Sequence, residues 1–263
     1  MASDAHYIRP AERGTYPVRS GNVVRPLIDG VPAFRRLCEA IEAAHQRVWG
    51  TVAFVDRTAL LPDGRGTLFD VLDRAAARGL DVRVVFWREP ELEPGRPGWE
   101  HFPGNAAERA WLRERGTRLR ACWDHLPRGC HHQKTWLVDA GEADEVALVG
   151  GINPDRMSLV ERGHRGPGEQ YHDVYLELRG PAATDVHHNF VQRWNTASER
   201  DQVGGAWPDD VAPDHLPLPT RQSVACGGVR VQIARTIPAE GERSVLEQYL
   251  AAIDGARHAI YLE

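Results

Sequence analysis

The sequence predicts an α/β fold made of one complete lobe and the beginning of a second, similar lobe. Apolar runs of strand length alternate with amphipathic stretches along most of the chain. A pattern near the start of the chain also returns near its end, at residues 252–260. We therefore predict four parts: an N-terminal extension (1–20), a first lobe (21–198), a connector between lobes (199–226) and the incomplete start of a second lobe (227–263).

The first half of the predicted lobe alternates strands with helices. A helix is expected at 32–45 because Phe34, Leu37, Ile41 and Ala44 fall on one face at helical spacing. A second helix is expected from Gly66 to Arg78, ended by Gly79. The strands expected around these helices span 23–28, 48–55 and 82–87.

The second half continues the alternation after a loop rich in proline and glycine at 89–104. A helix at 106–115 is expected to end before Gly116, and the helix at 181–197 has proline in its first turn. The remaining strands are expected at 118–123 and 173–178. A proline-rich acidic stretch at 198–219 is typical of a connector.

The chain contains a single lysine, Lys134, among 32 basic residues, and it lies in the string His132-x-Lys134-x4-Asp139. Lysine presents a compact point charge, whereas arginine presents a broad planar fork. A site that places one ammonium on a phosphate oxygen beside a reacting atom favours lysine. The alternative is that arginine-rich coding left one lysine here by chance.

A hairpin is predicted around this string. The strand carrying His132 and Lys134 on one face is followed by a turn and by the apolar run 146–149. Gly150 and Gly151 end that run and allow close approach of the backbone, and Asn153 follows them. These residues together predict a site for an anion the size of phosphate.

The H-x-K-x4-D string with the following G-G-x-N resembles the signature of the phospholipase D superfamily. Similarity to bacterial phospholipases D and cardiolipin synthases extends to Gly21-Asn22-Val23-Val24 and Leu27-Ile28-Asp29-Gly30 upstream, and downstream to His172-Asp173-Val174 and Phe190-Val191-Gln192-Arg193-Trp194-Asn195. The resemblance implies a phospholipase D-like lobe, with a mixed β-sheet flanked by helices on both faces.

The resemblance also implies roles for individual residues. His132 is the expected nucleophile that forms a phosphohistidine, while Lys134 and Asn153 are expected to bind the phosphate. Asp173 is expected to orient His132 and to fix its tautomer. Asp139 belongs to the catalytic motif, but at the end of its strand we expect it to organise the turn or the lobe interface.

Three further residues are candidates for the pocket: His172, Gly151 and Trp99. Trp99 shares the 89–104 loop with Phe102, where it is a candidate cover for an acyl chain or for contact with a membrane surface. No D-x-D, H-E-x-x-H or Cys/His ligand cluster stands out, so we expect neither a metal nor another cofactor.

The family usually carries two such motifs in each active site, and this chain has one. Residues 252–260 repeat the pattern of 40–48 at an offset of 212, which would put a partner for His132 near position 344. The repeat therefore predicts that a second lobe or a second copy of the chain completes the site. A chance likeness between two amphipathic helices is the alternative.

Composition limits the class of protein. The net charge of −5 disfavours a broad nucleic-acid-binding face, and no apolar run approaches membrane-spanning length. The absence of a signal-peptide core and of C-x-x-C spacing favours a cytoplasmic protein with reduced thiols, with peripheral contact to a membrane.

The preferred interpretation is an enzyme that cleaves or exchanges phospholipid head groups, with phospholipid and no nucleic acid as its partner. A dimeric, single-motif nuclease is the alternative. A scaffold without activity is disfavoured by the intact His132, Lys134, Asp139 and Asn153.

Overall fold

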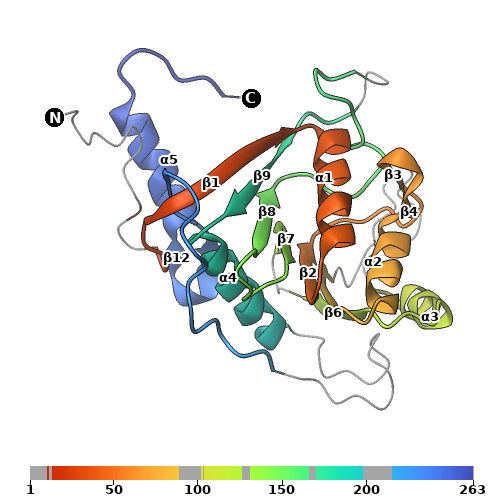
Figure 1. Ribbon diagram of the computed structural model, residues 1–263. Helices are drawn as coiled ribbons and strands as arrows, with labels where there is room; N and C mark the ends of the chain where they lie inside the picture. The colour runs from red at the N-terminus through yellow and green to blue at the C-terminus, as the bar shows by residue number, and fades with distance from the viewer. Residues whose placement is uncertain are drawn as a thin grey trace.

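The computed structural model describes residues 11, 14–88, 102, 104–125, 131–165, 170–197 and 215–262. Its centre is an eight-stranded sheet in the order β10-β1-β9-β8-β7-β2-β5-β6 (Figure 1). The strands are β1 (Arg19–Ile28), β2 (Arg47–Val52), β5 (Asp81–Trp87), β6 (Arg120–Asp124), β7 (Lys134–Val138), β8 (Val146–Gly150), β9 (Val174–Arg179) and β10 (Val229–Val231).

The sheet is mixed, as predicted. β2, β5 and β6 run parallel to one another, whereas the pairs from β2 through β7, β8, β9 and β1 to β10 are antiparallel. Two small ribbons lie outside it: β3 (Leu60–Leu61) with β4 (Gly66–Thr67), and β11 (Thr236–Ile237) with β12 (Glu242–Arg243). Short 3-10 turns, η1 (Pro62–Gly64) and η2 (Pro238–Glu240), connect the strands within each ribbon.

Helices cover both faces of the sheet. Helices α1 (Gly30–Ala43), α2 (Leu68–Ala77) and α3 (Ala106–Glu114) contribute to one buried cluster, and α4 (Ala183–Thr196) contributes to another. Neighbouring residues of β7 divide between the clusters, since Trp136 belongs to the first and Leu137 to the second. This follows from the alternation of side chains along a strand and confirms the predicted layered α/β fold.

Capping boxes determine where two helices begin. The Thr67 side chain accepts the Asp70 N–H while the Asp70 carboxylate accepts the Thr67 N–H, and Asn105 and Glu108 make the same exchange. Each cap of this kind is worth about 1 kcal/mol. Helix α2 therefore begins at Leu68, two residues later than its predicted start at Gly66.

The segment 227–263 packs against the first lobe in its described part. β10 pairs antiparallel with β1, and α5 (Ser244–Gly255) lies on the opposite side of the molecule from α2 and α3 (Figure 1). Arg235 is buried, and its guanidinium donates to Tyr16 and Glu242. A strand followed by a helix is the order predicted for the start of a second lobe, whose boundaries stay a prediction.

The loop predicted at 89–104 contains the pocket candidate Trp99 and the neighbouring Phe102. Trp99 lies outside the described residues, whereas Phe102 is 3% exposed and packs against Phe69, Phe86 and Trp123. Phe102 is therefore a core residue. Packing against these aromatic rings buries more of the apolar surface of Phe102 than a position on the surface of the loop would. The role expected for Trp99 stays a prediction.

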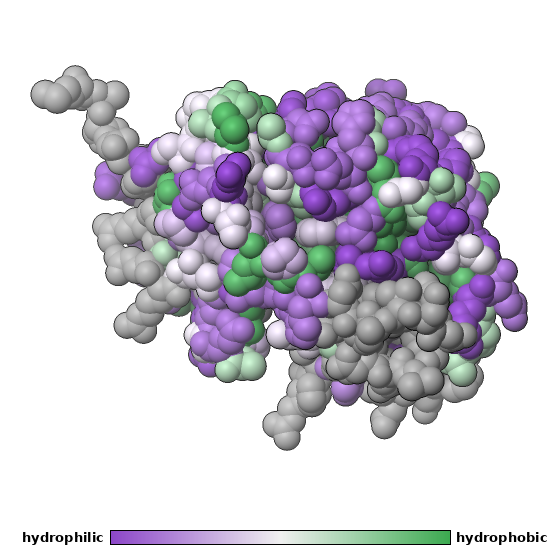
Figure 2. All heavy atoms as spheres, turned by 60° about the horizontal axis from the view of Figure 1, so that its bottom comes forward, coloured by the Kyte–Doolittle hydropathy of each residue, from purple (hydrophilic) through white to green (hydrophobic). Residues whose placement is uncertain are grey.

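The helices in the part of the chain that is described can be compared with the length and composition of a membrane-spanning helix. No helix there has both the length and the apolar composition required to cross a bilayer. On the face shown in Figure 2, green hydrophobic groups are small and are separated by purple hydrophilic ones.

Candidate active site

Four strand ends meet at one edge of the sheet and position the predicted site residues. Lys134, at the start of β7, pairs with Gly150 at the end of β8, and Gly150 pairs in turn with Tyr175 near the start of β9. The end of β2 is alongside, because Thr51 pairs with Thr135. Residues that leave or enter these strands therefore lie near Lys134.

Lys134 is 2% exposed, and its Nζ donates to the His132 carbonyl at 3.0 Å. The same nitrogen lies 5.5 Å from the centroid of the Phe54 ring, in a cation–π arrangement. An ammonium fits this enclosed position, whereas a planar guanidinium is larger and needs five donors satisfied. The burial of Lys134 agrees with the reason proposed for a lone lysine.

His132 lies two residues before Lys134, the first residue of β7, although the sequence predicted it within the strand. β8 ends opposite Lys134, so no ladder partner extends the strand to His132. The imidazole ring of His132 makes an edge contact with Phe54, with centroids 5.3 Å apart. Partial burial lowers the pKa of His132, the Lys134 charge lowers it further, and Asp173 opposes both. Its imidazole is therefore neutral near pH 7.

Asp173 and Gly151 come together at the start of β9. The Gly151 N–H donates to the Val174 carbonyl at 3.1 Å, and the Asp173 carboxylate accepts the Val174 N–H at 2.7 Å. A Cβ on residue 151 would lie 2.3 Å from Asp173 Oδ2, which is closer than any real contact. Glycine is therefore required at 151 for Asp173 to hold this position.

Asn153 links the exit of β8 to the exit of β2. Its Oδ1 accepts the Phe54 N–H at 3.3 Å, which orients the amide nitrogen as the remaining donor. Phe54 thus contacts His132, Lys134 and Asn153, although no role was predicted for it. Phe54 lies in the apolar run predicted as a strand at 48–55, where it resembles any core residue. No sequence signal therefore distinguished it as a site residue.

Asp139 lies at the other end of β7 and does not join this group. Its carboxylate accepts the backbone N–H groups of His45, Gln46 and Arg47 at 3.0, 2.7 and 3.0 Å. Its backbone is left-handed, with φ 52°. These contacts tie the end of the hairpin's first strand to the turn between α1 and β2.

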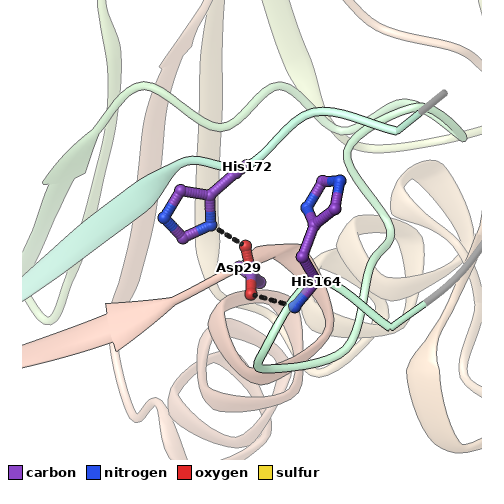
Figure 3. A group of neighbouring side chains, drawn as sticks. All are labelled: Asp29, His164 and His172. Atoms are coloured by element: carbon purple, nitrogen blue, oxygen red, sulfur yellow. Dashed lines mark hydrogen bonds and ion pairs between the residues drawn. The ribbon is translucent and has the colours of Figure 1, made fainter. Parts of the chain in front are cut away.

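His172 precedes Asp173, and its imidazole faces Asp29, which was not predicted as a site residue. His172 Nδ1 lies 2.6 Å from Asp29 Oδ1, and the His164 N–H donates to Asp29 Oδ2 at 3.4 Å (Figure 3). The Asp29 N–H in turn donates to the Asp173 carbonyl at 2.9 Å. His172 therefore belongs to a neighbouring cluster that shares backbone contacts with the site.

His131, the other histidine of the His131-His132 pair, is 3% exposed. Burial lowers its pKa to about 3, with a smaller contribution from the charge of Arg193. It is neutral and enclosed by protein, which separates it from its exposed neighbour His132.

Comparison with known proteins gives relatives across almost the whole chain, although no family model matches. Phospholipase D A of Dictyostelium discoideum is 26% identical over 94% of this chain and 22% of its own length. Cardiolipin synthase A of Pseudomonas entomophila is 25% identical over 95% of this chain and 46% of its own length. The chain thus spans about a fifth and about half of these two relatives.

Among solved structures, a phospholipase D family member, Nuc from Salmonella typhimurium, is similar with a TM-score of 0.45 and 18% identity. The alignment covers 68% of this chain and 97% of that one.

Proposed function

Because this chain belongs to the phospholipase D superfamily, we propose that it is a phosphodiesterase whose first step is attack by His132 on a phospholipid phosphorus. The observation that carries the proposal is a neutral His132 imidazole beside a buried lysine and a carboxylate. A neutral imidazole has the lone pair that attack requires, and the lysine supplies fixed positive charge for the phosphate oxygens.

The first step exchanges one bond for another at phosphorus. A ring nitrogen of His132 bonds to phosphorus while the bond from phosphorus to the head-group oxygen breaks, and that oxygen takes a proton. Lys134 and the amide of Asn153 would hold the other phosphate oxygens. Asp173 would stabilise the positive charge that the ring acquires, in line with its effect on the His132 pKa.

The second step removes the phosphohistidine. The oxygen of water or of an alcohol bonds to phosphorus, its proton passes to the group that gave up a proton in the first step, and the bond from phosphorus to the His132 nitrogen breaks. Hydrolysis and head-group exchange therefore share one intermediate. We assign the protonation of the head-group oxygen in the first step to a second histidine, from a second lobe or a second copy of the chain. No step in this scheme uses a metal or another cofactor.

Phospholipid is the substrate class we favour, with the protein peripheral to a membrane on the cytoplasmic side. Two relatives that align with more than nine-tenths of this chain are named as a phospholipase D and a cardiolipin synthase. The net charge of −5 also opposes attraction to a polyanion such as DNA.

The nucleophile can be tested without the missing acid. Bis(p-nitrophenyl) phosphate releases p-nitrophenolate, which leaves without protonation at neutral pH. We expect a burst of p-nitrophenolate equal to the protein concentration and a phosphorylated peptide containing His132 in an acid-free digest. His132→Ala should show neither, while His45→Ala, which changes an exposed histidine, should match the wild type. A burst that persists in His132→Ala would reject the nucleophile.

The substrate class needs a separate measurement. Vesicles of phosphatidylcholine or phosphatidylglycerol and single-stranded DNA should be incubated with the native-gene polypeptide. Release of choline or glycerol supports the proposal. Cleavage of DNA alone, dependent on His132, would instead support the dimeric nuclease.

A further inference from the structure

A second group of side chains lies beside the candidate active site and has no part in the scheme above. It consists of Asp29, between β1 and α1, His164, in the loop after β8, and His172, before β9. One ligand-type atom from each of the three residues lies within 4.8 Å of the others. Figure 3 shows the two imidazole rings side by side above the Asp29 carboxylate, and their centroids are 6.1 Å apart.

Asp29 is placed where helix capping is expected, but its carboxylate is used differently. It is the N-cap residue of α1, yet its side chain accepts no N–H from that helix. The carboxylate faces His172 and the backbone of His164. An N-cap aspartate ordinarily accepts an N–H of the first turn, so this orientation forgoes a stabilisation of about 1 kcal/mol.

The buried carboxylate of Asp29 depends on a histidine for its ion pair. The residue is 0% exposed, and its ion-pair partner among the described residues is the imidazole of His172, which is charged only when protonated. A buried carboxylate is costly unless a cation or several donors compensate it. A divalent cation shared with the two imidazoles would provide that compensation.

We propose that Asp29, His164 and His172 form a binding site for a divalent transition-metal ion of the zinc type. Two imidazoles and one carboxylate are a donor set suited to zinc, which commonly takes three protein ligands and leaves a fourth position open. The ion would replace the hydrogen bond between Asp29 Oδ1 and His172 Nδ1, which lie 2.6 Å apart.

The geometry can tighten to bind the ion. Ligand atoms about 2.0–2.1 Å from a tetrahedral zinc lie roughly 3.4 Å from one another. His164 and His172 are exposed, and the side chain of His172 is 52% exposed, so rotation about their side-chain bonds can close the gap. Asp29 is the buried, fixed member of the set.

The fourth position would open into a hollow of about 710 Å³ lined by Ile28, Arg162, Gly163, His164, Arg165 and His172. Arg162 and Arg165 oppose a cation there, but both are exposed, and solvent screens their charge more than that of buried Asp29. The same arginines favour an anionic or hydroxide fourth ligand.

Binding would join three segments that are distant in sequence. The ion would tie the β1–α1 junction and the 161–165 loop to the residue that precedes Asp173. The site is separate from the proposed nucleophile. Its test measures metal binding and does not depend on the phosphodiesterase assignment.

The experiment is titration of the metal-stripped chain with zinc chloride by calorimetry, and with cobalt chloride by visible absorption. We expect one equivalent to bind, with the intense d–d bands of four-coordinate cobalt, and zinc to raise the midpoint of thermal unfolding. His164→Ala and His172→Ala should each weaken zinc binding at least about tenfold. His45→Ala is the matched exposed-histidine control and should bind like the wild type.

Several results would overturn the proposal. Unchanged zinc affinity in both His164→Ala and His172→Ala would place the bound ion elsewhere, and an equal loss in His45→Ala would show non-specific binding. No saturable binding to a wild-type chain that unfolds cooperatively would also reject the site. Asp29→Asn provides a further check, because it keeps the size of the side chain and should weaken binding without deleting an imidazole.

Discussion

At the scale of single residues, the candidate site depends on which charges are buried and where. Lys134 is enclosed, while His132 stands at the rim with its ring against Phe54. The lysine charge disfavours protonation of the histidine, and Asp173 favours it. The balance leaves a neutral nucleophile beside a fixed cation, which is the combination that attack on a phosphate requires.

Lys134→Arg should lower the burst rate of the activated phosphodiester at least about 100-fold, since removal of one fixed electrostatic contact costs that much in other enzymes. The guanidinium is too large for a side-chain position that is 2% exposed. It also spreads its charge over a plane, whereas the lysine ammonium concentrates its charge at one point. The burst assay on the purified variant measures this, and circular dichroism checks the fold. A burst at the wild-type rate would contradict the role assigned to Lys134.

The pH dependence of the burst should report the His132 pKa. Because burial and Lys134 lower that pKa from its usual value near 6.5, the rate should be constant at neutral pH and fall only on acidification through the lowered pKa. Asp173→Asn removes the charge that raises the pKa, so its acid limb should move to lower pH. An acid limb that moves to higher pH in this variant would contradict the arrangement.

At the scale of elements, the two ends of β7 have different tasks. Its start carries Lys134 at the candidate active site, and its end is followed by Asp139, which receives three backbone N–H groups from the α1–β2 connection. Residues of one motif are thus divided between chemistry and the fixing of a turn. A strand of five residues is long enough to separate the two ends by roughly 15 Å.

Asp139→Ala should reduce the free energy of unfolding by about 3 kcal/mol, because three partly buried N–H groups lose their acceptor and alanine is strained at a φ of 52°. Urea denaturation measures the change. Asp144→Ala, an exposed acid in the same turn, is the control and should stay within about 0.5 kcal/mol of the wild type. An Asp139→Ala variant that is fully stable but inactive would show that Asp139 takes part in the reaction.

At the scale of the whole molecule, the described structure contains one H-x-K motif and an apolar surface near its end. On α5, Leu246, Tyr249, Leu250 and Ile253 are each about half exposed, between 47% and 63%. A stripe of this kind on one helix is typical of a surface that another element covers. A second lobe or a second copy of the chain could cover this stripe on α5, and either would also supply a second histidine.

We therefore expect the native-gene polypeptide either to have a mass near twice 29.4 kDa, or to have a mass of 29.4 kDa and to dimerise. Mass spectrometry gives the first value, and light scattering after size exclusion gives the second. In the dimeric case Leu250→Glu should yield a monomer that retains the burst but loses turnover. A wild-type monomer of 29.4 kDa with full turnover would contradict the need for a second histidine.

The amino-acid sequence predicted the α/β alternation and most strands and helices to within a few residues, and its resemblance to a known superfamily predicted the group of Lys134, His132, Asn153 and Asp173. These depend on local periodicity, turn residues and a motif, which neighbouring residues encode. The predicted roles of these four residues await the experiments above.

Contacts between residues distant in sequence emerged from the folded chain. Phe54 joins Asn153 across 99 positions, and Asp29 meets His172 across 143. The burial of Phe102 and the backbone partners of Asp139 were decided in the same way. Such contacts follow from strand order and register in the sheet, which depend on the packing of the whole chain and leave no local periodicity to read.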